Sequence, residues 1–163
     1  MAQDAMKKLF VQGLQALYTA GEEGSKSAAA NLDSASSPEL KQALRDGSEL
    51  AKRHADRIQQ LFQMAGAQPG STDNPILQGI QTANKRILDA SDDAQTRDAG
   101  IIATGQIALH YHIAAFGTLA GHAKALGITD AAGVLHQMVQ ECKQMDERYT
   151  QIAETVVNPQ ASA

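Results

Sequence analysis

The chain has 163 residues and a mass of 17.3 kDa, the size of one ordinary domain that can bury a core without disulfide or metal cross-links. Its net charge of −4 argues against a surface that binds nucleic acid or an anionic membrane. Its single cysteine, Cys142, excludes an intrachain disulfide. Aromatic residues make up only 4% and tryptophan is absent, so the core must be built from alanine and aliphatic residues, a composition that favours close-packed helices over sheets.

The first half of the chain predicts two long helices. Helical periodicity runs over about residues 4–31, and a turn of small polar residues is expected at 32–37. Ser37 followed by Pro38 is typical of an N-cap and the first position of a helix. The helix that begins there should end near Met64, because a loop with prolines and glycines follows.

A shorter helix is expected after Pro75, where four apolar residues are spaced to share one face. These residues are Ile76, Ile80, Ala83 and Ile87. Either Asp92 or Asp93 is the expected N-cap of a third long helix, which should continue to about Leu126. The chain shows no strand-like alternation of apolar and polar residues, so the sequence predicts an all-α fold.

Gly127 is predicted to end the third long helix, and Thr129 to cap a fourth one over residues 130–156. Short turns join the first pair and the last pair of long helices, whereas about thirty residues join the two pairs; this connectivity is typical of a ferritin-like four-helix bundle with one long crossover, here containing a short extra helix. The bundle should cover residues 1–157, followed by a disordered tail at 158–163.

Membrane insertion and secretion are not expected. The most apolar segment, residues 99–126, is interrupted by one glutamine and three histidines, which a bilayer-spanning helix could not carry cheaply. A single cysteine fits a reducing compartment, so we expect a cytoplasmic protein.

The segment AGIIATGQIALHYHIAAFGTLAGHAKALG, residues 99–127, contains an H-Y-x-I-A core, a G-T-L-A run from Gly117 to Ala120 and a closing L-G. It resembles the corresponding helix of the YciE/YciF family of bacterial stress-induced ferritin-like proteins, and the similarity extends over essentially the whole chain. Further matching residues are Leu17, Tyr18, Thr19, Ala20, Arg57, Ile58, Ala131, Ala132, Leu135 and Asp146. The resemblance implies a ferritin-like bundle that is commonly dimeric and induced by stress, without a settled biochemical activity.

Relatives of this fold often hold two metal ions between the four long helices, with inward carboxylates and histidines as ligands. The resemblance implies that four positions of inward acids are neutral in this chain: Gly21, Leu50, Leu109 and Cys142. Each lies on or beside the apolar stripe of its helix, which indicates that packed neutral side chains have replaced the metal site. We therefore predict no catalytic, cofactor-binding or metal site; iron or manganese would be the cofactor only under the alternative below.

Some acids near these positions stay weak candidates for metal ligands. Glu22, Glu23 and Glu49 lie one position from the missing acids, and one residue rotates a side chain by about 100° around a helix, so they should face solvent or a groove between helices. His54 lies on the inward stripe of its helix. We interpret it as a hydrogen-bonded core imidazole rather than a ligand.

The remaining weak candidates are His110, Glu141 and Asp146. His110 and His112 lie two residues apart, so they should point to different faces and cannot chelate one ion. Glu141 and Asp146 are expected to lie beside the basic residues of their own helix on a solvated face. These positions therefore add no convincing ligand set.

Nucleophilic catalysis is also disfavoured. A triad of Cys142, His54 and Asp146 is imaginable, but a helix supplies no strained turn that would expose a nucleophile. Cys142 is expected to be a buried, inert thiol. The sequence thus leans against an enzyme without deciding the question.

Two further features concern contacts between helices. Gly117 and Gly121 form a G-x-x-x-G spacing that permits close helix approach, and we predict a helix–helix contact there, with a homodimer interface as one form of it. Tyr111 is expected to be a hydrogen-bonding group at the edge of the bundle.

Three functions remain open. The first is a metal-free, ferritin-like stress protein that acts by self-association or by binding an unknown protein partner. The second is a di-iron or di-manganese oxidase or peroxide-handling enzyme, which the missing acids disfavour. The third is a small-molecule-binding protein, in which loss of the carboxylates left an apolar slot bounded by His54 and Cys142.

Overall fold

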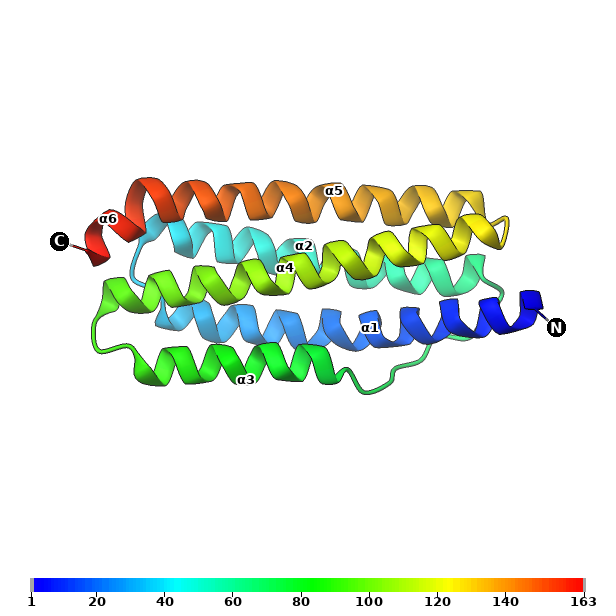
Figure 1. Ribbon diagram of the computed structural model, residues 1–163, viewed down its shortest axis with the longest axis horizontal. Helices are drawn as coiled ribbons and strands as arrows, with labels where there is room; N and C mark the ends of the chain where they lie inside the picture. The colour runs from blue at the N-terminus through cyan, green and yellow to red at the C-terminus, as the bar shows by residue number, and fades with distance from the viewer. Residues whose placement is uncertain (1, 163) are drawn as a thin grey trace.

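The computed structural model describes residues 2–162, excluding the side chains of Ala2 and Glu22. All regular structure in this described part is helical, which confirms the predicted fold class. Its long helices are α1 (Ala2–Ser34), α2 (Pro38–Met64), α4 (Ala94–Ala125) and α5 (Thr129–Ile152). They lie side by side along the long axis of the molecule, with the shorter α3 (Pro75–Ala90) below them in the view of Figure 1.

The predicted N-cap of α2 at Ser37 and its predicted end near Met64 are confirmed, whereas the predicted end of α1 is corrected. The Ser37 Oγ accepts a hydrogen bond from the Leu40 N–H at 3.3 Å, as an N-cap should. The helix before it does not end at residue 31 but continues to Ser34. The polar residues expected to form a turn therefore form the last turn of α1 instead, and only three residues separate the two helices.

The short helix begins at Pro75 as expected, and its packed face was predicted in part. Ile80 lines the space between the helices and Ile87 lies against Gly100 of α4, as expected. Ile76, however, is 62% exposed, whereas the neighbouring Leu77 is 4% exposed. Ala83, also expected on the packed face, is exposed.

At the next boundaries, Asp93 is the N-cap of α4, with its Oδ1 accepting from the Thr96 N–H at 2.7 Å. Gly127 ends that helix with φ of +75°, a left-handed conformation that glycine adopts without strain. Thr129 is not a cap: it is the first residue of α5, and the preceding Ile128 makes no side-chain capping bond. Ile128 occupies the N-cap position, and its aliphatic side chain has no oxygen that could accept a hydrogen bond.

The end of the chain differs from the expected disordered tail. After α5, a single π-helical turn, η1 (Ala153–Val157), leads directly into the short helix α6 (Asn158–Ala161). The Asn158 N–H donates to the Ala153 carbonyl across this wider turn. Val157 is 1% exposed, so the last turn before α6 is packed, whereas the side chains of α6 are exposed.

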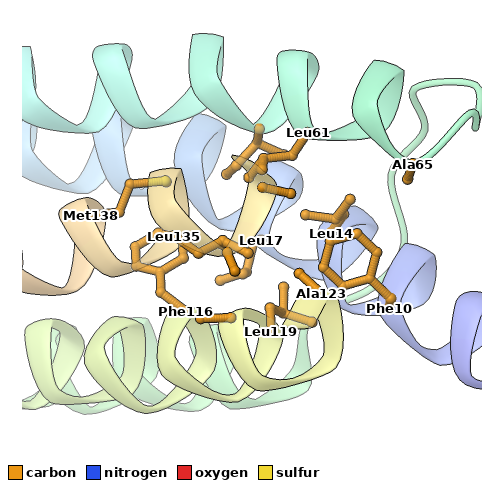
Figure 2. Close-up of a cluster of buried hydrophobic side chains, with 14 of the residues drawn as sticks. Phe10, Leu14, Leu17, Leu61, Ala65, Phe116, Leu119, Ala123, Leu135 and Met138 are labelled. Atoms are coloured by element: carbon orange, nitrogen blue, oxygen red, sulfur yellow. The ribbon is translucent and has the colours of Figure 1, made fainter. Parts of the chain in front are cut away.

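The four long helices contact one another around a common axis. Helix α1 packs against α2 and α4, and α5 packs against the same two helices, so α1 and α5 lie on opposite corners. Figure 2 shows apolar side chains from all four helices pointing into the space between them. No helix among the described residues is long and apolar enough to cross a membrane.

The buried apolar residues form two clusters along this axis. One cluster, drawn in Figure 2, includes Phe10, Phe116 and Leu135. The other includes Leu40, Ile101 and Tyr149 and lies toward the opposite end of the long helices. The stretch between the two clusters contains the candidate site.

Candidate functional site

A cavity of about 170 Å³ lies between the two apolar clusters. It is bordered by residues from α1, α2, α3, α4 and α5. It exists because small residues recur at helical spacing on the inward faces of three helices: Gly21, Gly24 and Ala28 on α1, Gly47 and Ala51 on α2, and Gly105 and Ala108 on α4. Gly24 is partly exposed, and a Cβ added there would meet no atom within 4 Å, so the cavity is open beside this residue.

At four positions where the resemblance implies an inward acid, this chain has a neutral residue, and the structure places all four at this cavity. Gly21, Leu50, Leu109 and Cys142 come from four different helices, and each one lines it. Leu50 is 7% exposed and Cys142 is 2% exposed. The sequence prediction that these positions face the interior is therefore confirmed, but they surround a void rather than fill it.

A charged cluster lies beside the cavity and was not predicted as such. The Glu141 Oε2 accepts hydrogen bonds from Arg57 Nη1 at 2.6 Å and from His54 Nε2 at 2.8 Å. Its other oxygen, Oε1, accepts from Gln137 Nε2 at 3.1 Å. The expectation that Glu141 lies on a solvated face beside basic residues of α5 is wrong, because its partners on α2 draw it into the seam between α2 and α5.

The electrostatics of this cluster are those of a satisfied ion pair. Burial alone would raise the pKa of Glu141, but the hydrogen bonds from Arg57 and His54 outweigh it and leave the pKa below its usual value. Burial lowers the pKa of His54 in spite of the neighbouring carboxylate. His54 is thus a neutral imidazole that donates its Nε2–H to Glu141, which agrees with the predicted hydrogen-bonded core histidine.

A second histidine, His112, lines the cavity from α4. Its Nδ1–H donates to the Ala108 carbonyl at 2.8 Å, and burial lowers its pKa to about 4. Its ring lies 5.6 Å from that of Phe116, which in turn packs edge-on against His54 at 5.3 Å. His112 is therefore neutral and faces the interior, whereas His110 is 66% exposed, so the two histidines point to different faces as expected.

The imagined nucleophilic triad is not assembled. Cys142 is buried, and desolvation raises the pKa of its thiol to about 12, so it is not ionised at neutral pH. His54 pairs with Glu141, and Asp146 accepts instead from His110 Nε2 at 3.1 Å. The prediction of an inert cysteine fits this arrangement.

Asp146 was expected on a solvated face beside the basic residues of α5, and this is also wrong. Its side chain is 20% exposed and binds Gln106 as well as His110, both from α4. Arg148, the basic residue nearby, pairs with Asp46 of α2. The two candidate acids of α5 thus contact different helices, Glu141 contacting α2 and Asp146 contacting α4, and they do not converge on one site.

The other weak candidates lie at the surface. Glu23 pairs with Lys26 at 3.0 Å, and Glu49 pairs with Lys52 at 2.7 Å; both are partners on the same helix. These two acids face away from the interior, as predicted. The side chain of Glu22 lies outside the described part of the structure.

Tyr111 and the G-x-x-x-G pair have different outcomes. The Tyr111 hydroxyl accepts from Asn74 Nδ2 at 2.7 Å at the edge of the helices, as expected. Gly117 and Gly121 are exposed, and a Cβ at either position would meet nothing within 4 Å. They form no helix–helix contact within the chain, which corrects that prediction; a contact between two chains stays a prediction.

The residues present do not fit a dinuclear metal centre. Among the described side chains none that lines the cavity carries a charge, and no group of three or more histidine, cysteine, aspartate or glutamate residues is arranged there to hold a metal ion. The carboxylate nearest the interior, Glu141, already has a guanidinium as its cation. Two metal cations in such an interior would lack the anionic oxygens that neutralise them.

Sequence reasoning missed several polar residues of the cavity, among them Asn31 and Tyr149. Desolvation raises the pKa of Tyr149 to about 12. The signal that could have located this region was the recurrence of glycine and alanine at matching spacing on three different helices.

Comparisons with known proteins agree with the resemblance inferred from the sequence. A family model described as "Domain of unknown function (DUF892)" matches residues 5–162. Protein YciF of Escherichia coli is 26% identical over 162 residues, which cover 99% of this chain and 98% of YciF.

Two solved structures are also similar. The crystal structure of the E. coli stress protein YciF has a TM-score of 0.88 and 27% identity, covering 94% of this chain and 97% of that one. The structure of YcfI from Rhodopseudomonas palustris, proposed as a structural protein, has a TM-score of 0.86 and 27% identity, covering 89% of this chain and 92% of that one. The similarity to the YciE/YciF family is confirmed.

Proposed function

We propose that this chain, which belongs to the family described as "Domain of unknown function (DUF892)", is a metal-free, stress-associated structural or interaction protein built as a ferritin-like four-helix bundle. Its similarity to a protein named as a stress protein, and to one proposed as a structural protein, supports this reading. The pairing of α1 with α2 and of α4 with α5, with α3 in the long crossover, supports the ferritin-like connectivity.

The observation that carries the proposal is the chemistry of the interior. Leu50, Leu109 and Cys142, with Gly21, present only neutral groups at the level where ferritin-like relatives gather carboxylates. The alternative of a di-iron or di-manganese oxidase would need several anionic oxygens there. Glu141, the acid nearest to it, is fully engaged by Arg57, His54 and Gln137.

Self-association is part of the proposal, and α4 is the helix that supports it. Its exposed positions from residue 103 to residue 121 carry no charged side chain: Ala103, Ile107, His110, Ala114, Gly117, Thr118 and Gly121. Ile107, a large apolar side chain, lies within this uncharged stripe and is 55% exposed. A second copy of the chain packed on this stripe would form a homodimer. We also place the protein in the cytoplasm, where its single thiol stays reduced.

The homodimer gives the first testable prediction. Gly117→Lys introduces a charge in the middle of the α4 stripe without any clash inside the chain, so it should weaken a dimer at least about tenfold because a buried unpaired charge is costly. Gly133→Lys, at an exposed glycine of α5 with the same free space, is the matched control. Native mass spectrometry at micromolar concentration should show a dimer for the parent chain and the control; monomer alone for the parent chain would refute the self-association.

A further inference from the structure

We propose that the interior cavity is a binding site for an uncharged, unbranched aliphatic molecule that carries one oxygen head group, such as a medium-chain alcohol. This goes beyond the structural role proposed above and does not depend on it. The proposal depends on the shape of the cavity, its lack of charge, and two hydrogen-bonding groups that have no partner at one end of it.

The cavity is long and narrow. On α1 it is bordered by residues from Leu17 to Asn31, fourteen positions apart, which corresponds to about 21 Å along a helix. Its volume of about 170 Å³ is close to that of an apolar cavity of about 150 Å³ known to bind a small hydrocarbon. A volume of this size spread along such a length accommodates a chain of several methylene groups and not a compact ring system.

The lining selects against charge. Among the residues whose side chains the structure describes, it contains no lysine, arginine, aspartate or glutamate, and burial keeps both of its histidines, His54 and His112, in the neutral form. A carboxylate or ammonium ligand would therefore lose its hydration without gaining a counter-charge. Leu17, Ile58 and Phe116 make the other end of the cavity apolar.

The polar end is built by Asn31 of α1 and Tyr149 of α5. The Asn31 Oδ1 accepts from Asn84 Nδ2 at 2.9 Å, and Asn84 in turn accepts from Thr104 at 2.6 Å, which fixes the asparagine amide. The ring of Tyr149 packs on Gly105, the next residue of α4. The Tyr149 hydroxyl lies beside Gly47 of α2, and Tyr149, Gly47 and Asn31 all line the cavity.

Both groups have hydrogen-bonding capacity to spare. Asn31 is 8% exposed and Tyr149 is 6% exposed. No hydrogen bond from the Asn31 Nδ2 or the Tyr149 hydroxyl is found within residues 2–162, and neither atom is completely enclosed, so both keep accessible surface where their residues line the cavity. The oxygen atom of a ligand in the cavity can therefore accept a hydrogen bond from either group.

A route into the cavity lies between α1 and α3. On this side the lining residues Gly24, Ser27 and Gln81 are partly exposed. Two hydrogen bonds join the helices along this gap, from Gln81 Nε2 to Ser27 Oγ at 3.3 Å and from Asn84 Nδ2 to Asn31 Oδ1 at 2.9 Å. A ligand can thus enter by displacing the longer Gln81–Ser27 contact rather than by opening the packed core.

The test is isothermal titration calorimetry of the full chain with octan-1-ol, and with octanoate at pH 8 as the charged counterpart. We expect octan-1-ol to bind with a dissociation constant between micromolar and sub-millimolar, as a ligand of this size allows. Octanoate should bind at least about tenfold more weakly, because its carboxylate finds no cation in the lining. Absence of binding by octan-1-ol, or equal binding of octanoate, would overturn the proposal.

Variants then locate the site. Gly24→Leu should fill the cavity and abolish binding, whereas Gly133→Leu, a glycine of equal freedom on the exposed face of α5, should bind as the parent chain does. Ala108→Leu fills the same space from α4 if the first variant fails to fold. Tyr149→Phe should weaken octan-1-ol about tenfold at most, the effect of one lost hydrogen bond. Undiminished binding by both filled variants would place the ligand elsewhere and refute the site.

Discussion

Leu50→Glu is expected to lower the free energy of unfolding by about 3–5 kcal/mol at pH 7, because it places a carboxylate in an interior without a compensating charge. Leu50 is 7% exposed and lines a cavity without any charged side chain. Arg57 cannot serve the new carboxylate without leaving Glu141. Chemical denaturation at pH 7, followed by circular dichroism, measures the effect.

The pH dependence separates charge from shape, with Leu50→Gln as the matched neutral variant. Burial should raise the pKa of the introduced carboxyl group above its unfolded value of about 4.3. Below that value the group is protonated in both states, so the two variants should be similarly stable. As the pH rises, ionisation favours the unfolded state and the glutamate variant should become progressively less stable than the glutamine variant. A constant difference between pH 4 and pH 7 would show that the interior already hydrates or neutralises a carboxylate.

Arg57→Met should cost about 2–3 kcal/mol at pH 7. It removes the counter-charge of Glu141, whose side chain is 21% exposed, and leaves the carboxylate with only neutral donors. Arg148→Met is the matched control, because Arg148 pairs with Asp46 at a more exposed site where an ion pair contributes less than about 1 kcal/mol. Equal losses of unfolding free energy in the two variants would show that the Arg57–Glu141 pair contributes no more to stability than the more exposed Arg148–Asp46 pair.

The same pair predicts how stability changes in acid. The pKa of Glu141 in the folded chain is lower than in the unfolded chain. The stabilisation from its ion pair is therefore fully present above the unfolded pKa of about 4.3 and is lost as the pH falls through the lower folded value. The difference between the parent chain and Arg57→Met should accordingly shrink below about pH 4.

Local signals explain which parts of the fold could be predicted from the sequence. Ser37 with Pro38, Asp93 and Gly127 each act on the backbone within a few residues, and all three mark helix boundaries in the structure. On α3, Ile76 was expected on the packed face in place of Leu77, because the two residues are equally apolar. Only the position of α4 decides which of them is buried, and a single sequence does not contain that information.

The candidate site was less predictable because its features join distant parts of the chain. The bond between His54 and Glu141 spans 87 positions, and helical periodicity alone cannot tell which acid faces which histidine. The void depends on small residues that face one another across α1, α2 and α4, so no single helix reveals it. The inward direction of Leu50 and Cys142, in contrast, followed from the apolar stripe of each helix.

The most direct test of a neutral interior is the metal content of the folded protein. The chain should be produced in cells supplied with iron and manganese, purified without chelators, and measured by inductively coupled plasma mass spectrometry. We expect amounts far below one ion per chain, unchanged after incubation with ferrous or manganous salts. About two ions per chain, retained through desalting and bound by groups inside the four helices as in dinuclear ferritin-like sites, would contradict the account.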